Sequence, residues 1–87
     1  MRDSELLQMV GFTIRKIRDG PGYSQEAFAR DAGIDRAYYG RIERGEANIT
    51  LKGLFRIARQ LQTCPSEFLI YVEEEDLDPA RDIHLDP

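Results

Sequence analysis

The stretch RAYYGRIER, from Arg36 to Arg44, gathers side chains that can recognise nucleic-acid bases. A guanidinium presents a planar fork of donors that fits O6 and N7 of guanine, and a methyl group or an aromatic edge can pack on the methyl group of thymine. Three arginines, an alanine and two adjacent tyrosines lie within this stretch. The pattern therefore favours readout of base edges, provided that a helix holds these side chains on one exposed face.

Charge is divided unevenly along the chain. The formal net charge of the 87 residues is −4, which by itself argues against a polyanionic partner. Residues 73–87, the acidic segment, hold seven acids and one base, whereas residues 1–72 hold eleven bases and nine acids. Between positions 36 and 59 there are six bases and only two acids. An anionic partner is therefore expected to dock on this middle part of the chain.

No group of residues predicts catalysis or metal binding. A nucleophile, a general base and an orienting group do not recur together, and RDGPGYS lacks the lysine and the glycine spacing of a phosphate-binding loop. The one histidine, His84, lies in the acidic segment, and the one cysteine, Cys64, precedes Pro65 at an expected helix start. A single thiol makes neither an internal disulfide nor a thiolate metal site. We expect no enzyme activity, no cofactor and no metal ion.

The length of the chain allows one small domain with a single core. No window approaches the roughly 18 consecutive apolar residues that would span a membrane. The first residues, MRDSELLQMVGF, contain early acids and no long apolar run, so they do not resemble a secretory signal. A cytoplasmic location is expected.

The hydrophobic spacing predicts helices only. Apolar residues at helical intervals predict a first helix over residues 5–18, and the turn-forming DGPG ends it. Ser24 is a suitable N-cap and Gly33 a suitable C-cap for a second helix over 25–32. Asp35 can cap a third helix over 36–44 that ends at Gly45.

Two further helices are predicted after residue 50. Thr50 can cap the fourth helix. Pro65 suits the first position of a fifth, short helix through SEFLIYVEE. The expected inward positions of the fourth helix are Leu51, Leu54, Ile57, Ala58 and Leu61. The sequence thus predicts an all-α bundle of five helices.

The second and third helices are short and joined by a tight glycine-containing turn, which is the arrangement that places a second helix in a DNA major groove. On the third helix, Tyr39 and Ile42 have the spacing of core residues. The side chains on the opposite face are then the candidates for base contacts: Arg36, Ala37, Tyr38 and Arg41. Tyr38 is accordingly expected to make contacts and Tyr39 to lie in the core.

The order and spacing of five segments within residues 14–69 resemble a known family. The segments are IRKIRD, YSQEAFARDAGI, YYGRIERG, LFRIARQL and CPSEFL. Together they resemble the XRE-type helix-turn-helix domain of phage repressor and Cro proteins and of restriction-modification controller proteins. The resemblance implies a lambda repressor-like bundle that binds double-stranded DNA as a homodimer on a palindromic operator, and a regulator of transcription that acts as a repressor or controller.

The resemblance also implies roles for particular residues. Gln25 matches the glutamine that opens the second helix of the family and contacts phosphate or an operator base. Arg36, Ala37, Tyr38 and Arg41 match its base-reading positions. Arg44, Asn48 and Lys52 match positions that contact the DNA backbone. Arg18 and Glu43 match a salt bridge that ties the first helix to the recognition helix.

Two features depart from the family pattern. Gly40 stands inside the recognition helix where a polar residue is more usual, and it lowers helix propensity by roughly 0.5 to 1 kcal/mol relative to alanine. The pattern of a folded domain stops near residue 75, so we expect a helix-turn-helix domain over 1–75 and an acidic tail over 76–87. Solvated disorder, a strap across a partner subunit and a lid on the basic face are alternatives for this tail.

The fifth helix has more apolar surface than so small a bundle needs. It could complete the core of one protomer, form a two-fold interface, or do both. The residues concerned are Phe68, Leu69, Tyr71 and Val72.

A binding module of another class is the alternative function. An antitoxin or adaptor could use the same bundle and bind a protein partner through the fifth helix and the acidic tail. Only Leu77, Ile83 and Leu85 are available in the tail as apolar anchors for such a partner.

Overall fold

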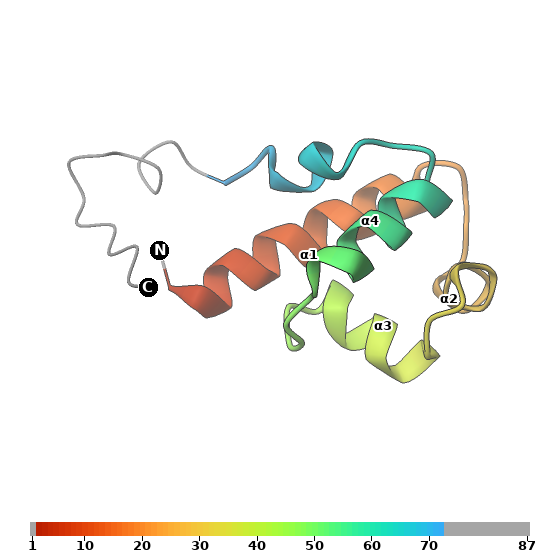
Figure 1. Cartoon of the computed structure of the whole chain (residues 1–87), viewed down its shortest axis with the longest axis horizontal. Coiled ribbons are helices and arrows are strands. Elements are labelled where there is room, and N and C mark those ends of the chain that lie inside the picture. The colour runs from red at the N-terminus through yellow and green to blue at the C-terminus, as the bar shows by residue number, and fades with distance from the viewer. Residues whose placement is uncertain (1, 73–87) are drawn as a thin grey trace.

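The computed structural model describes residues 2–72 as a bundle of helices. Four α-helices are followed by one short 3-10 helix, and the described residues contain no strand. The elements are α1 (Asp3–Asp19), α2 (Gln25–Ala32), α3 (Arg36–Glu43), α4 (Leu51–Gln60) and η1 (Pro65–Leu69). In Figure 1 the long helix α1 crosses the molecule, with α3 below it and η1 above it.

Side-chain caps fix where the three middle helices begin. Ser24 accepts a hydrogen bond from the backbone N–H of Ala27, and Thr50 accepts one from Gly53. Asp35 caps α3 in the same way. The predicted starts of these three helices are therefore confirmed. Helix α1 is longer than predicted, since it begins at Asp3 rather than near residue 5.

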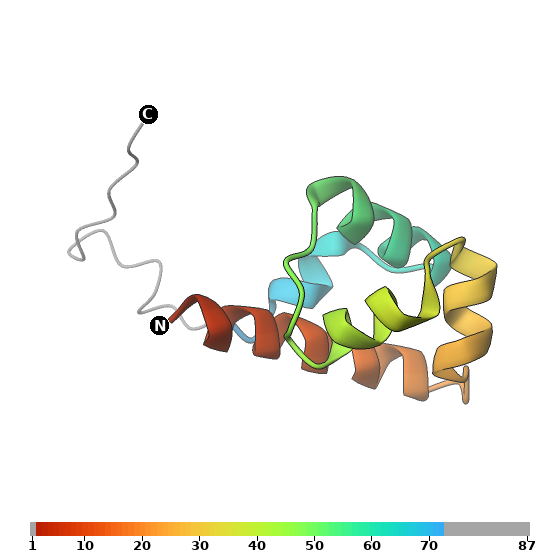
Figure 2. The ribbon, with the colours of Figure 1, turned by 90° about the horizontal axis from the view of Figure 1, so that it is seen from below.

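The turn between α2 and α3 depends on Gly33. This residue has φ +70° and its N–H closes the end of α2 on the carbonyl oxygens of Ala29 and Arg30. Only two residues then remain before α3 begins at Arg36. Figure 2 shows α2 and α3 at a steep angle to each other, as a helix-turn-helix requires.

The core lies where all five elements meet. Its largest fully buried side chains are Ile14, Phe28, Tyr39, Ile57 and Phe68, which come from α1, α2, α3, α4 and η1 in turn. The rings of Phe28 and Tyr39 lie 5.0 Å apart between their centroids and are tilted by 44°, so the two helices of the motif pack on each other through this pair.

Gly11 sets the distance between α1 and α3. A Cβ atom at this position would overlap the carbonyl oxygens of Ile42 and Glu43 at the end of α3. These two elements therefore pack backbone to backbone, which a larger residue would prevent. The amphipathic pattern used to predict the first helix did not identify this requirement.

The prediction of a fifth α-helix was wrong. The segment forms one 3-10 helix, Pro65–Leu69, because only Phe68 is buried and one anchor does not hold a longer helix in place. Leu51 was also expected in the core but is 72% exposed, because it occupies the first turn of α4 before the helix reaches the core.

The predicted boundary at residue 75 and the acidic tail lie outside the described residues. None of the helices in the described part of the chain is long and apolar enough to cross a membrane.

Candidate nucleic-acid interface

Helix α3 turns one face to the core and the other to solvent. Tyr39 is fully buried and Ile42 is 3% exposed. The four predicted base-contacting residues lie on the exposed face: Arg36, Ala37, Tyr38 and Arg41. The spacing of three residues between Tyr39 and Ile42 produces this division, because it is close to one turn of helix.

Tyr38 is exposed but held in place. Its hydroxyl donates a hydrogen bond of 2.9 Å to the backbone oxygen of Asn48, in the loop that follows α3. The ring therefore links α3 to this loop, and 36% of the residue remains accessible. An anchored ring can offer an edge to a thymine methyl group at a smaller cost in side-chain entropy than a free one.

A buried ion pair ties α1 to α3. The Arg18 guanidinium donates two hydrogen bonds to Glu43, with Nε to Oε2 at 2.6 Å and Nη2 to Oε1 at 3.0 Å. Nη1 of Arg18 also donates to the backbone oxygen of Tyr23 at 2.6 Å. The pair thus fixes the C-terminal end of α3 and the segment that leads into α2 at the same time.

The surroundings of this pair keep both groups charged. The hydrogen bond to Glu43 raises the pKa of Arg18 above its usual value. Burial alone would raise the pKa of Glu43, but the hydrogen bonds from Arg18 and Gln25 outweigh it and lower that pKa. Burial also raises the pKa of the Tyr39 hydroxyl, far above its usual range.

Gln25 and Arg44 meet beside Gly40. Nε2 of Gln25 donates to Oε1 of Glu43 at 3.0 Å, which orients the amide at the start of α2. A Cβ atom at Gly40 would lie 3.1 Å from Nη1 of Arg44 and 3.4 Å from Oε1 of Gln25. The missing side chain therefore leaves space in which these two predicted backbone-contacting residues approach each other across α3.

An open hollow of about 370 Å³ lies beside Gln25 and Arg44. It is lined by Arg15, Arg18, Gln25, Glu43 and Arg44. Arg15 was not predicted as a site residue, because its proximity to α2 and α3 follows from the packing of α1 and not from any local pattern.

A second hollow, of about 320 Å³, joins the turn before α3 to the beginning of α4. Asp35 and Tyr38 line it from one side, and Lys52 and Arg56 line it from the other. Lys52 was predicted and Arg56 was not. The signal that could have found Arg56 is its position four residues after Lys52, on the same face of the helix.

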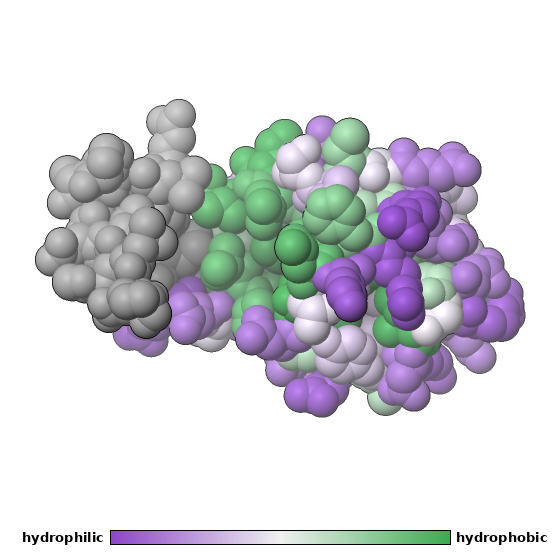
Figure 3. Space-filling model, viewed as in Figure 1, coloured by the Kyte–Doolittle hydropathy of each residue, from purple (hydrophilic) through white to green (hydrophobic). Residues whose placement is uncertain are grey.

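The predicted interface residues of the fifth helix separate into two groups. Phe68 is 1% exposed and belongs to the core of the protomer, so it is not available to a partner. Leu69 and Tyr71 are 47% and 53% exposed, and Val72 is partly buried. Ile70, which was not predicted, is 61% exposed. Figure 3 shows apolar surface gathered on the half of the molecule next to the end of the described chain.

The comparison with known families agrees with this architecture. The model of the helix-turn-helix family HTH_3 matches residues 14–69, which includes both helices of the motif and η1. The chain belongs to this family. The predicted resemblance to the XRE-type helix-turn-helix domain is thereby confirmed.

The relatives of this HTH_3 chain include several control proteins. The control protein C.MunI from Mycoplasma is 36% identical over 66 residues, which are 75% of this chain and 89% of C.MunI. The structure of the restriction-modification controller protein C.AhdI from Aeromonas hydrophila matches with a TM-score of 0.69 and 37% identity, and covers 71% of this chain and 94% of C.AhdI.

A third relative was solved on DNA. The restriction-modification controller protein C.Esp1396I, as a tetramer in complex with its natural 35-base-pair operator, matches this chain with a TM-score of 0.68 and 37% identity. The match covers 84% of this chain and 96% of the C.Esp1396I chain.

Proposed function

We propose that this HTH_3 protein is a sequence-specific DNA-binding regulator of transcription that binds a palindromic operator as a homodimer. The observation that carries the proposal is the exposed face of α3, where Arg36, Tyr38 and Arg41 lie opposite a fully packed inner face. Helix α3 is thereby presented as a recognition helix, with these three side chains exposed on the side where base edges would lie. Relatives that are control proteins, one of them on its operator, support the same function.

In this proposal one group of residues contacts the bases and another contacts the DNA backbone. Base edges are read by Arg36, Ala37, Tyr38 and Arg41. Backbone phosphates are contacted by Gln25, Arg44, Asn48 and Lys52, and these contacts fix the register of the protein on the duplex. Glu43 orients the amide of Gln25, and Nη1 of Arg44 lies beside Gly40, next to the same amide.

Two copies are needed to read a palindrome. Leu69, Tyr71 and Val72 supply apolar surface at the end of η1, and a two-fold contact there would bring two copies of α3 to one side of the dimer. A separation of roughly 34 Å, one turn of B-DNA, would then place them in successive major grooves. Occupancy of an operator that overlaps a promoter is the mechanism by which such a dimer represses or controls its own or a neighbouring operon.

Selection from a random-sequence DNA pool tests the proposal. The full chain is incubated with the pool at about 150 mM salt, where non-specific phosphate attraction is weakened, and the bound DNA is sequenced. Enrichment of a palindrome with half-sites about one turn apart is expected. Protein that is folded by circular dichroism but enriches no sequence would contradict it, and would favour the alternative of an antitoxin or adaptor. The acidic part of that alternative lies outside the described residues.

A further inference from the structure

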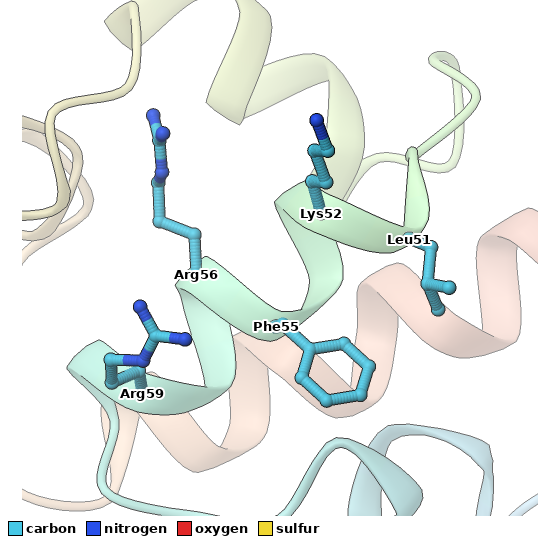
Figure 4. Close-up of a pocket in the computed structure, with 5 residues that line it drawn as sticks. All are labelled: Leu51, Lys52, Phe55, Arg56 and Arg59. Atoms are coloured by element: carbon cyan, nitrogen blue, oxygen red, sulfur yellow. The ribbon is translucent and has the colours of Figure 1, made fainter.

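Helix α4 carries a groove that no described segment fills. The groove is an open hollow of about 430 Å³ lined by Leu51, Lys52, Phe55, Arg56 and Arg59. Its cations follow a spacing of four and three residues along α4, and its two apolar residues are four apart. Figure 4 shows Lys52 and Arg56 extending to one side of the helix and Leu51 and Phe55 to the other.

The side chains of this groove lack partners within the described structure. Among residues 2–72, none of Lys52, Arg56 and Arg59 takes part in an ion pair, and α4 itself, LKGLFRIARQ, contains no acid. Leu51 is 72% exposed and Phe55 is 48% exposed. Cations beside exposed apolar side chains suit an acidic segment that also carries an apolar residue.

The chain itself contains such a segment. Residues 73–87 hold seven acids and one base, and four consecutive acids, residues 73–76, are followed directly by Leu77. The order of acids and then leucine complements a row of cations beside Leu51 and Phe55.

The acidic segment also starts in the right place. The last described residue is Val72, which follows η1, and η1 packs against α4. The acid run and Leu77 follow Val72 directly, and these five residues span about 16 Å when extended, at roughly 3.3 Å per residue. This length is close to the roughly 15 Å of a ten-residue helix such as α4.

We propose that residues 73–87 bind the α4 groove of their own chain, with the acid run on Lys52, Arg56 and Arg59 and with Leu77 against Leu51 and Phe55. Covalent connection gives the segment an effective concentration of the order of millimolar, so a weak contact is enough to fill the groove. Salt weakens this contact, because the cations are exposed and charges at a surface are screened over about 8 Å at physiological ionic strength.

Competition with DNA is a consequence that rests on the proposed function. Lys52 belongs both to this groove and to the proposed phosphate contacts, and Arg56 lies with Tyr38 around the neighbouring hollow. A segment bound on α4 would therefore occupy cations that DNA needs. The docking itself does not depend on DNA binding and is tested without DNA.

Zero-length cross-linking tests the docking on the full chain. A carbodiimide joins a lysine amine to a carboxylate only where the two are in contact, and the chain has two lysines, Lys16 and Lys52. Lys16 lies on α1 beside Phe12 and serves as the internal control. At low salt we expect an amide between Lys52 and an acid within residues 73–78. Its yield should be at least five times the yield of a link between Lys16 and the same acids.

Mixed labelling and variants complete the test. In a mixture of nitrogen-14 and nitrogen-15 chains, the links are expected within single chains, and links mainly between chains would overturn the proposal in favour of a second copy. Leu51→Ser and Arg56→Gln should each lower the Lys52 yield several-fold, whereas Arg15→Gln on α1 should not. Equal yields of links from Lys16 and Lys52 to residues 73–78 would also overturn the proposal. So would a Lys52 yield that does not change in folded Leu51→Ser and Arg56→Gln protein.

Discussion

At the scale of single residues, the buried pair of Arg18 and Glu43 has the largest expected effect on stability. The two side chains are 7% and 2% exposed, so removing one charge leaves the other buried without compensation. We predict that Glu43→Gln lowers the free energy of unfolding by about 3 kcal/mol at neutral pH, measured by urea titration. The exposed substitution Glu26→Gln is the control and should change it by less than about 0.5 kcal/mol.

The same pair predicts how stability depends on pH. The pKa of Glu43 is lower in the folded protein than in the unfolded chain, so its stabilisation is complete above the unfolded value of about 4.3. This stabilisation is lost as the pH falls through the pKa of Glu43 in the folded protein. The free energy of unfolding of Glu26→Gln should therefore decrease more steeply below about pH 4 than that of Glu43→Gln. Parallel curves for the two variants would contradict this role of Glu43.

Tyr39 offers a second test at this scale. Its ring fills the core, but its buried hydroxyl has no hydrogen-bond partner of acceptable geometry among residues 2–72. A buried unsatisfied hydroxyl costs about 1 to 3 kcal/mol, so Tyr39→Phe is expected to leave stability unchanged or to raise it by about 1 kcal/mol. Thermal and urea unfolding measure the change. A loss of more than about 1 kcal/mol would show that the hydroxyl is satisfied, with Glu43 the nearest acceptor to examine.

At the scale of elements, the contact between α1 and α3 is the least tolerant of change. Gly11→Ala would place a methyl group against two backbone carbonyl groups of α3, and neither can move without displacing the recognition helix. We predict a loss of about 1 to 3 kcal/mol despite the better helix propensity of alanine. Ser4→Ala, at an exposed position in the first turn of α1, is the control and should change the free energy of unfolding by less than about 0.5 kcal/mol.

Caps and periodicity were enough to predict most of the elements. Ser24, Asp35 and Thr50 mark helix starts because a short polar side chain satisfies an N–H group locally, and such an effect is visible in the sequence. The fifth segment was mispredicted because Pro65 and its apolar residues allow either an α-helix or a 3-10 turn. The number of side chains that reach the core decides between them, and only Phe68 does.

The candidate site could be predicted only in part. The exposed face of α3 follows from the spacing of Tyr39 and Ile42, which is a local property. The presence of Arg15 beside Gln25 and of Arg56 beside Tyr38 depends on how α1 and α4 pack against the motif. No local pattern encodes the position of Arg15, whereas Arg56 could have been found from its spacing of four residues after Lys52.

At the scale of the whole molecule, apolar surface at the end of η1 and in the residues that follow predicts self-association. Leu69→Glu should weaken dimer formation at least tenfold, because a charge would have to be buried in the two-fold contact. Sedimentation equilibrium measures the dissociation constant. Phe12→Glu is the control, because Phe12 is similarly exposed, at 56%, but lies on α1. A dimer that is weakened by Phe12→Glu and not by Leu69→Glu would place the interface on another face.

The central claim is that the exposed face of α3 reads base edges, and a paired selection tests it most directly. Wild-type protein and Arg41→Ala are each selected against the same random DNA pool at about 150 mM salt. The account predicts one palindrome for both, with preference relaxed at one base pair of each half-site in the variant and affinity for the wild-type site lowered by about 1 to 3 kcal/mol. An unchanged preference at every position, or an equal loss of affinity on all sequences, would contradict it.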